Sequence, residues 1–312
     1  MEGMFLKFEP GRSPFSITHD DQLLFLGSCF SDEIASRAKD SGFHCASNPF
    51  GTVFHPLPLA RFLKETIAGS AEERILKRED HFFSWDASTL LYGKSNDEVF
   101  TKLQKVRLEW RNQLKTASVL FVTFGTAWGY SYHDSMVVAN CHKVSQSEFR
   151  KELSETIEIL EAWKDVLGIL REFNPTLKVV FTVSPVRHIR DGLIENNQSK
   201  AILLDAVRRL NKEKGSFYFP SYEIVIDQLR DYRFFKQDRV HPTDEAVSVV
   251  WESFLNYYVN DSTRLIVKEI NAYHRFKAHI PRNSDEKGLA DYSERCDRLN
   301  SELKTKYPNV WV

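Results

Sequence analysis

Continuous apolar runs alternate with segments of helical period over most of the chain. The runs at 23–26, 119–123 and 179–183 are typical of strands buried on both faces of a parallel sheet, and shorter strands are predicted at 43–46 and 217–219. Between them apolar residues recur every three or four positions. Helices are therefore predicted from Ser31 to Gly42 and at 59–68, 95–114, 145–173, 199–214, 223–231 and 243–258. Because parallel strands need long crossovers, the pattern predicts an α/β fold, with a parallel sheet between helices on both faces.

Two internal regions and the end of the chain depart from this alternation. Residues 80–92 are rich in aromatic residues without a helical period, which predicts a small inserted hairpin or flap, and the alternating segment 128–140 predicts a second hairpin. After residue 260 the chain is highly charged and has two helical stretches and no strand. We expect a domain over residues 1–259 and a helical extension over 260–312, which either wraps the domain or makes a homo-oligomer contact.

The composition is that of an ordinary soluble protein. Of the 312 residues, 42% are hydrophobic and 27% are charged, and the net charge of −1 gives no reason to expect a nucleic acid or a membrane as partner. The four cysteines lack CxxC or zinc spacing, which predicts free thiols in a reducing compartment. The histidines are too scattered for a ligand set, so neither a metal nor another cofactor is expected.

The sequence from Leu26 to Cys29 would pass as a bacterial lipoprotein cleavage site. The apolar run before it holds only about four residues, however, against the roughly 7–15 of a secretion signal. No run approaches the ~18 apolar residues of a membrane span. We therefore expect a cytoplasmic protein.

One serine lies where open α/β sheets gather their active sites. The apolar run 23–26 ends in Gly27-Ser28, and a helix-start signal follows at once, with Ser31 as the N-cap and acidic residues in the first turn. Ser28 should then be exposed on a turn between the carboxyl end of a strand and the start of a helix, where the crevice of such sheets lies. The alternative is that Ser28 only caps the helix.

A second polar cluster stands near the other end of the domain. Asp238 precedes His241 by three residues, on a loop that enters a helix. A carboxylate at that spacing can turn onto the imidazole and fix its tautomer, leaving the other ring nitrogen free to act as a base toward a serine. The alternative is a helix-capping Asp beside a surface His.

Both clusters resemble the motifs of one known family. The run Gly27-Ser28-Cys29-Phe30-Ser31 resembles the signature of the GSCFA family, a branch of the SGNH/GDSL hydrolases. Further stretches similar to that family follow in order at 48–51, 123–128, 139–143, 183–188 and 238–242. The resemblance implies a flavodoxin-like three-layer α/β/α sandwich. It also implies that Ser28 is the nucleophile, His241 the base and Asp238 the residue that orients His241.

The resemblance also implies an oxyanion hole, built in SGNH enzymes from the N–H of the serine, the N–H of a glycine after the second strand and an Asn side chain after the third. Gly51 fits the glycine by position, but the third-strand stretch has no Asn. Thr126, Asn48 or Asn140 would have to replace that donor, or else they serve only in turns.

Three other residues compete for roles in the crevice. Cys29 is a thiol beside Ser28, although adjacent side chains on a turn point apart and a free buried Cys is the commoner outcome. Arg187 and His188 follow a central strand. Arg187 would bind a substrate carboxylate or phosphate, or else form a structural ion pair, and His188 is a substitute base.

These observations favour a serine esterase that removes short acyl groups, such as acetyl, from a carbohydrate-like substrate through an acyl-serine intermediate. The substrate class follows from family analogy alone. Two alternatives remain open: an acyltransferase that uses the same triad, and a binding or scaffold protein that keeps the fold with weak catalysis. The absent third-strand Asn favours the last of these.

Overall fold

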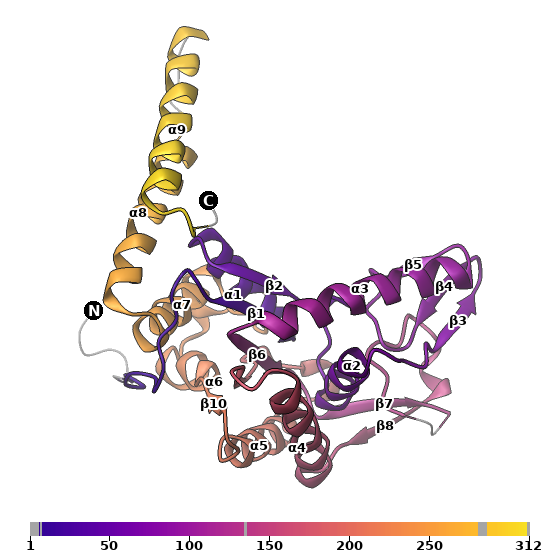
Figure 1. Cartoon of the computed structure of the whole chain (residues 1–312). Helices are drawn as coiled ribbons and strands as arrows, with labels where there is room; N and C mark the ends of the chain where they lie inside the picture. The colour runs from indigo at the N-terminus through magenta and orange to yellow at the C-terminus, as the bar shows by residue number, and fades with distance from the viewer. Residues whose placement is uncertain (1–5, 7, 134–135, 280–285, 311–312) are drawn as a thin grey trace.

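The computed structural model describes residues 6, 8–133, 136–279 and 286–310. Five parallel strands form the central sheet (Figure 1). They are β1 (Gln22–Gly27), β2 (His44–Ser47), β6 (Val119–Phe124), β9 (Lys178–Val183) and β10 (Ser216–Tyr218), in the order β10-β9-β6-β1-β2. Counted within this sheet, the order is 2-1-3-4-5, which is the flavodoxin-like arrangement and confirms the predicted fold class.

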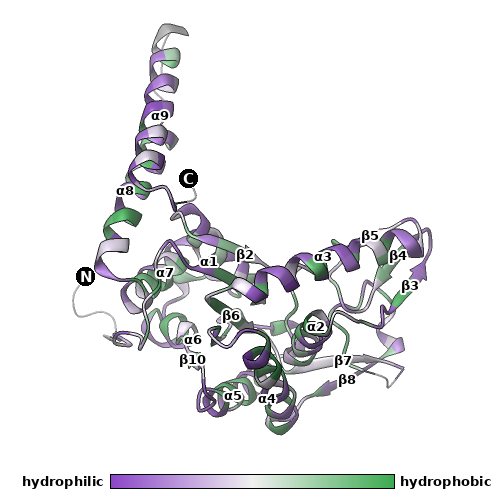
Figure 2. Ribbon diagram, viewed as in Figure 1, coloured by the Kyte–Doolittle hydropathy of each residue, from purple (hydrophilic) through white to green (hydrophobic). Residues whose placement is uncertain are grey.

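Helices cover both faces of the sheet because alternate strand residues point to opposite sides. Leu24, Leu120 and Phe181 face one helical layer, whereas Phe25, Phe121 and Val180 face the other. The first layer holds α2 (Pro56–Ala68), α3 (Asn96–Thr116), α4 (Thr156–Phe173) and α5 (Leu193–Leu210), and the second holds α1 (Cys29–Asp40) and α7 (Asp244–Tyr258). In Figure 2 hydrophobic residues concentrate in β6 and on the helices around it.

Two small antiparallel sheets extend the first layer. The predicted flap is three-stranded, with β3 (Ile75–Arg78), β4 (His81–Ser84) and β5 (Tyr92–Gly93). The hairpin predicted within 128–140 is present as one antiparallel bridge between Ser131 and Val137, with a hydrogen bond from Val138 to the carbonyl of Tyr130. The main partner of β7 (Trp128–Tyr132) is the later β8 (Phe149–Leu153), and 134–135 lie outside the described residues.

The helix predicted at 145–173 begins later than expected, because residues 149–153 form β8, and it ends at Phe173 as predicted. Ser145 accepts the N–H of Ser147 and closes only a short 3₁₀ turn, η1 (Gln146–Glu148). The ring of Phe149 then packs edge-on against Trp85, 5.6 Å between centroids, which favours an extended strand. Helix α4 begins at Thr156, after a capping box formed by Glu155 and Glu158.

The remaining short helices shape the loops beyond β9 and β10. They are η2 (Ile189–Asp191), α6 (Ser221–Glu223), its π-helical continuation η3 (Ile224–Gln228) and η4 (Tyr232–Phe234). The helix predicted at 223–231 therefore starts and ends earlier than expected.

Two helices follow the sandwich and form a hairpin that projects from it (Figure 1). They are α8 (Asp261–Ala278) and α9 (Glu286–Lys306), joined by contacts such as Lys306 with Glu269 at 2.8 Å. Hydrophilic residues predominate along α9 (Figure 2). Beyond α9 the chain returns to the sheet, where the carbonyl of Asn309 lies 3.1 Å from Nε2 of His44. None of the helices in the described ranges has the length and apolar character needed to span a membrane.

Candidate active site

Ser28 follows β1 directly, at the switch point of the sheet. β1 pairs with β2 on one side and with β6 on the other, and the strand order reverses there. The N–H of Ser28 donates to the carbonyl of Thr123 at 3.2 Å. Gly27 has φ +131°, and a Cβ at this position would lie 2.1 Å from the same carbonyl oxygen, so only glycine lets the turn approach β6 this closely.

Ser28, and not Ser31, is the N-cap residue of α1. The hydroxyl of Ser31 lies 3.2 Å from the carbonyl of Leu26 and 2.8 Å from Oγ1 of Thr123, so Ser31 ties the first turn of the helix to β6. The prediction that Ser31 caps the helix was wrong. The hydroxyl of Ser31 instead contacts Thr123, which lies 92 residues away, and a sequence pattern does not indicate a contact between such distant residues.

The hydroxyl of Ser28 is buried and has no hydrogen-bond partner among the described residues. It makes no capping bond to the first turn of α1, which a serine that only caps a helix would make. The expectation that Ser28 is exposed was wrong. Residues 48–54 run across the strand ends, where Val53 donates to Gly27 and Gly125 donates to Phe54, and this crossing accompanies the burial of Ser28.

Asp238 and His241 form the pair that their spacing predicts. Oδ2 of Asp238 lies 2.6 Å from Nδ1 of His241. Oδ1 accepts the N–H groups of Val240 and His241 at 2.9 and 3.0 Å. These bonds hold the pKa of Asp238 well below its ordinary value, so the carboxylate stays charged and keeps a proton on Nδ1 of the imidazole.

His188 lies near this pair and is half-buried. Its ring packs edge-on against Phe54, 5.5 Å between centroids, and interacts electrostatically with His241 and Lys200. Burial and the nearby Lys200 lower its pKa to about 4, so the ring is neutral, and its Nε2 has no partner in the described chain. Two buried atoms without a hydrogen-bond partner, Oγ of Ser28 and Nε2 of His188, thus belong to segments that follow the carboxyl ends of β1 and β9. No hydrogen bond joins Ser28 to His241 in the structure.

Asn48 and Gly51 build the turn beside Ser28. Oδ1 of Asn48 accepts the N–H of Gly27 at 2.7 Å, and its Nδ2 donates to Asp32 at 2.8 Å. The N–H of Gly51 donates to the carbonyl of Asn48 at 2.8 Å. Gly51 has φ +77°, and a Cβ there would lie 1.9 Å from Oγ of Ser88. Only glycine fits at position 51, because any side chain would collide with Ser88. The N–H of Gly51 is already bonded within the turn.

Thr126 and Asn140 are also engaged elsewhere. Oγ1 of Thr126 lies 3.1 Å from Oγ of Ser199 and accepts the N–H of Trp128 at 3.0 Å. Asn140 accepts the N–H of His142 in a local turn. That turn belongs to the antiparallel insertions, because the neighbouring Ala139 donates to the carbonyl of Trp85.

Arg187 contacts the loop that carries Asp238 and His241. Its guanidinium lies 4.1 Å from the ring centroid of Phe235, and Nη1 donates to the carbonyl of Arg239 at 3.0 Å. These contacts stabilise the loop.

The GSCFA family model matches residues 22–254, which include both clusters. The chain belongs to the GSCFA family. No curated protein sequence matches it significantly.

Solved structures resemble this GSCFA chain only loosely. A carbohydrate esterase of family 3 from Talaromyces cellulolyticus aligns over 81% of this chain and 99% of its own, at 8% identity and a TM-score of 0.34. A family 2 carbohydrate esterase from Clostridium thermocellum aligns over 82% and 66%, at 10% identity and a TM-score of 0.35. The acetyl xylan esterase Est2A from Butyrivibrio proteoclasticus aligns over 77% and 64%, at 11% identity and a TM-score of 0.39.

Lys200 is a residue of this GSCFA site that the sequence interpretation missed. It lies on α5 with 2% of its surface exposed, and Nζ donates to the carbonyls of Gly125 at 2.6 Å and Ser184 at 2.7 Å. The sequence carried a signal. Asn196, Ser199 and Lys200 share the helical face of the buried Leu203, Val207 and Leu210, and polar residues on an apolar face indicate a structured polar site.

The surroundings of Cys29 disfavour its thiolate form. Burial raises its pKa, which keeps the thiol protonated, and nearby Asp32 acts in the same direction. All four cysteines are free, as expected. Within the described residues, no group of three or more His, Cys, Asp or Glu side chains is arranged to hold a metal ion.

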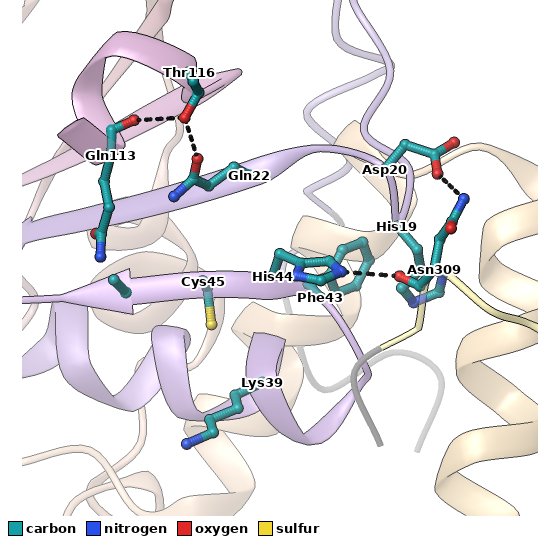
Figure 3. A pocket seen from close by; sticks show the side chains of 11 residues that line it. His19, Asp20, Gln22, Lys39, Phe43, His44, Cys45, Gln113, Thr116 and Asn309 are labelled. Carbon is teal, nitrogen blue, oxygen red and sulfur yellow. Dashed lines mark hydrogen bonds between the residues drawn. The ribbon is translucent and has the colours of Figure 1, made fainter. Parts of the chain in front are cut away.

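A cavity of about 730 Å³ lies at the opposite edge of the sheet, beside the first residues of β1 and β2 (Figure 3). Its walls carry Gln22, Lys39, Cys45, Gln113 and Thr116, and Oγ1 of Thr116 donates to Oε1 of Gln22 at 2.8 Å. Ser28 stands at the carboxyl end of β1, so this cavity is separate from the candidate active site.

Proposed function

We propose that this GSCFA protein is an SGNH-type serine esterase that cleaves short acyl esters such as acetyl on a carbohydrate. The observation that carries the proposal is the hydroxyl of Ser28, which is buried, unpartnered and placed at the N-terminus of α1. A serine in that environment is free to attack a carbonyl carbon, and the helix N-terminus favours the negative charge that develops on the carbonyl oxygen.

The proposed reaction uses His241 as the base and Asp238 as its positioning partner. Oγ of Ser28 bonds to the acyl carbon while its proton passes to Nε2 of His241, and the ester C–O bond breaks as that proton moves to the leaving alcohol. Water then attacks the acyl carbon while His241 takes its proton, and the bond from the acyl carbon to Oγ breaks as that proton passes to Ser28, which releases the carboxylic acid. No hydrogen bond joins Ser28 to His241 in the structure, so their contact forms in the complex with substrate.

A second candidate function is a binding protein with weak catalysis. The favouring observation is that two expected oxyanion donors, the N–H groups of Ser28 and Gly51, already donate to Thr123 and Asn48. The same triad would also serve acyl transfer to a sugar hydroxyl, with that hydroxyl replacing water in the second step.

The test is intact-mass spectrometry after incubation with a fluorophosphonate probe, on the wild type, Ser28→Ala and Ser31→Ala. We expect a single adduct on the wild type and on Ser31→Ala, and none on Ser28→Ala. Ser31 is a matched control because it is a buried serine in the same turn whose hydroxyl is engaged. Folded wild-type protein without an adduct would contradict the esterase and favour the binding protein.

If the adduct forms, hydrolysis of p-nitrophenyl acetate and of acetylated sugars follows. Release of acetate into water identifies the esterase, whereas acetyl appearing on an added sugar acceptor identifies the transferase.

A further inference from the structure

Lys200 lies at the carboxyl ends of the central strands and has no acidic partner among the described residues. It comes from α5, and its Nζ reaches the two residues that directly follow β6 and β9, Gly125 and Ser184. These strands are adjacent, and Ser184 donates to Phe124, so the lysine adds a side-chain bridge just beyond the last backbone bond of the ladder. Among the described residues, Nζ forms no ion pair with a carboxylate.

A buried lysine without a carboxylate is costly, which indicates that the site uses it. Two carbonyls occupy two of the N–H groups on Nζ. The ammonium form then has one donor left, and the neutral amine has a lone pair in its place. In either form, one hydrogen-bonding position of Nζ therefore has no partner within the described protein.

Two titratable groups interact electrostatically with Lys200, and both belong to the candidate active site. One is Cys29, the first residue of α1 and the neighbour of Ser28, and the other is His188, whose Nε2 is buried and unpartnered. The hydrogen bonds agree with this placement, because the N–H of Ser28 donates to the carbonyl of Thr123, two residues before the Gly125 carbonyl that Lys200 contacts. The lysine therefore lies at the same end of the sheet as Ser28, where an oxyanion would form on its acyl group.

We propose that Lys200, in its ammonium form, stabilises the oxyanion of the Ser28 reaction in place of the Asn that SGNH enzymes carry after the third strand. The proposal rests on the esterase function proposed above. In this role two N–H groups of Nζ fix Gly125 and Ser184, and the remaining one donates to the oxyanion. Lys200 is not the base, because the charged form accepts no proton.

The protonation equilibrium of Lys200 makes this role measurable. Burial lowers the pKa of Lys200 to about 7, against a smaller opposing effect of Cys29. The ammonium form is then lost as the pH rises through about 7, so the rate at which Ser28 reacts should fall over the same range. A purely structural lysine would give no such dependence.

The experiment measures the rate of fluorophosphonate labelling of Ser28 between pH 5 and pH 10 in wild type, Lys200→Met, Lys200→Arg and the surface control Lys212→Met. We expect Lys200→Met to label roughly 100-fold more slowly and without an alkaline decline, which is the usual loss for one oxyanion donor. Lys200→Arg keeps its charge at high pH, so the alkaline decline should disappear while labelling continues. Lys212→Met should behave as the wild type.

Wild-type labelling kinetics in Lys200→Met, or an alkaline decline that persists in both Lys200 variants, would overturn the proposal. If the variants fail to fold, ¹⁵N NMR of the lysine Nζ atoms in the wild type replaces them. The midpoint of the Lys200 titration must then coincide with the midpoint of the decline in labelling, and separate midpoints would overturn the proposal. Absence of any Ser28 adduct on the wild type would instead refute the esterase function itself.

Discussion

Asp238 holds His241 through both of its carboxylate oxygens. Oδ2 lies 2.6 Å from the imidazole Nδ1, while Oδ1 accepts the backbone N–H of His241 at 3.0 Å. One side chain thus fixes the ring and the loop that carries it, and the two functions can be separated by substitution.

Asp238→Asn should preserve the loop and impair the base. The amide oxygen can still accept the N–H groups of Val240 and His241, but the amide nitrogen would face Nδ1 and favour the wrong imidazole tautomer. We expect kcat for p-nitrophenyl acetate to fall about 10³–10⁴-fold with little change in KM. Asp244→Asn, on the exposed first turn of α7, is the control. An unchanged kcat would remove Asp238 from the mechanism.

Gly27→Ala should damage the turn that presents Ser28. Its Cβ would lie 2.1 Å from a backbone oxygen at φ +131°, and neither strand can shift without breaking the sheet. We expect a loss of roughly 2 kcal/mol or more in the free energy of unfolding and slower labelling of Ser28. Gly168→Ala is the opposite case, because nothing lies within 4 Å of the added Cβ on α4, and it should stabilise by about 0.5–1 kcal/mol. Urea denaturation measures both, and equal effects would contradict the prediction.

A buried ion-pair network joins the flap to the first helical layer. Arg107 on α3 pairs with Glu73 at 2.9 Å and with Glu65 at 3.0 Å. Arg74 links Glu65 to Asp86, both at 2.7 Å. The side chains of Arg107 and Glu73 are only 6% and 3% exposed, so removing one charge leaves the other buried and unpaired.

Arg107→Met should therefore destabilise the protein by roughly 3–5 kcal/mol in urea denaturation. Lys64→Met breaks the exposed pair with Asp165 and should cost less than about 1 kcal/mol. A similar small loss in both variants would show that the network does not hold the flap.

His55 should make the folded state sensitive to acid. Its Nδ1 accepts the N–H of Leu57 and its Nε2 donates to the carbonyl of Ala127 at 3.2 Å, a pattern that only the neutral ring satisfies. Burial lowers the pKa of His55 to about 4 from its ordinary 6.5. Between these values the unfolded state binds more protons than the folded state, so stability is full above about pH 6.5 and falls as the pH drops toward 4.

The predicted loss from His55 is roughly 3 kcal/mol across that window, and His55→Asn should reduce it. The measurement is urea denaturation at pH 7.5 and pH 5 for the wild type, His55→Asn and the exposed His81→Asn. A pH dependence that is unchanged in His55→Asn would assign the acid sensitivity to other groups, such as His19 and His142, whose pKa burial also lowers.

The sequence by itself determined what depends on neighbours along the chain. Apolar runs specify strands through their own burial pattern, so the alternation of strands and helices was predictable. The same is true of the turn at Ser28 and of the contact between Asp238 and His241, because three residues of loop bring the carboxylate to the ring. Family membership also followed from short motifs.

Only the tertiary structure decided what depends on contacts between distant residues. It pairs β7 with β8 and places residues 48–54 over the strand ends. It also brings Lys200 to a carbonyl 75 residues away. A local pattern states which face of an element is apolar but not which groups meet it, because a hydrogen bond between distant residues depends on how whole strands and helices pack.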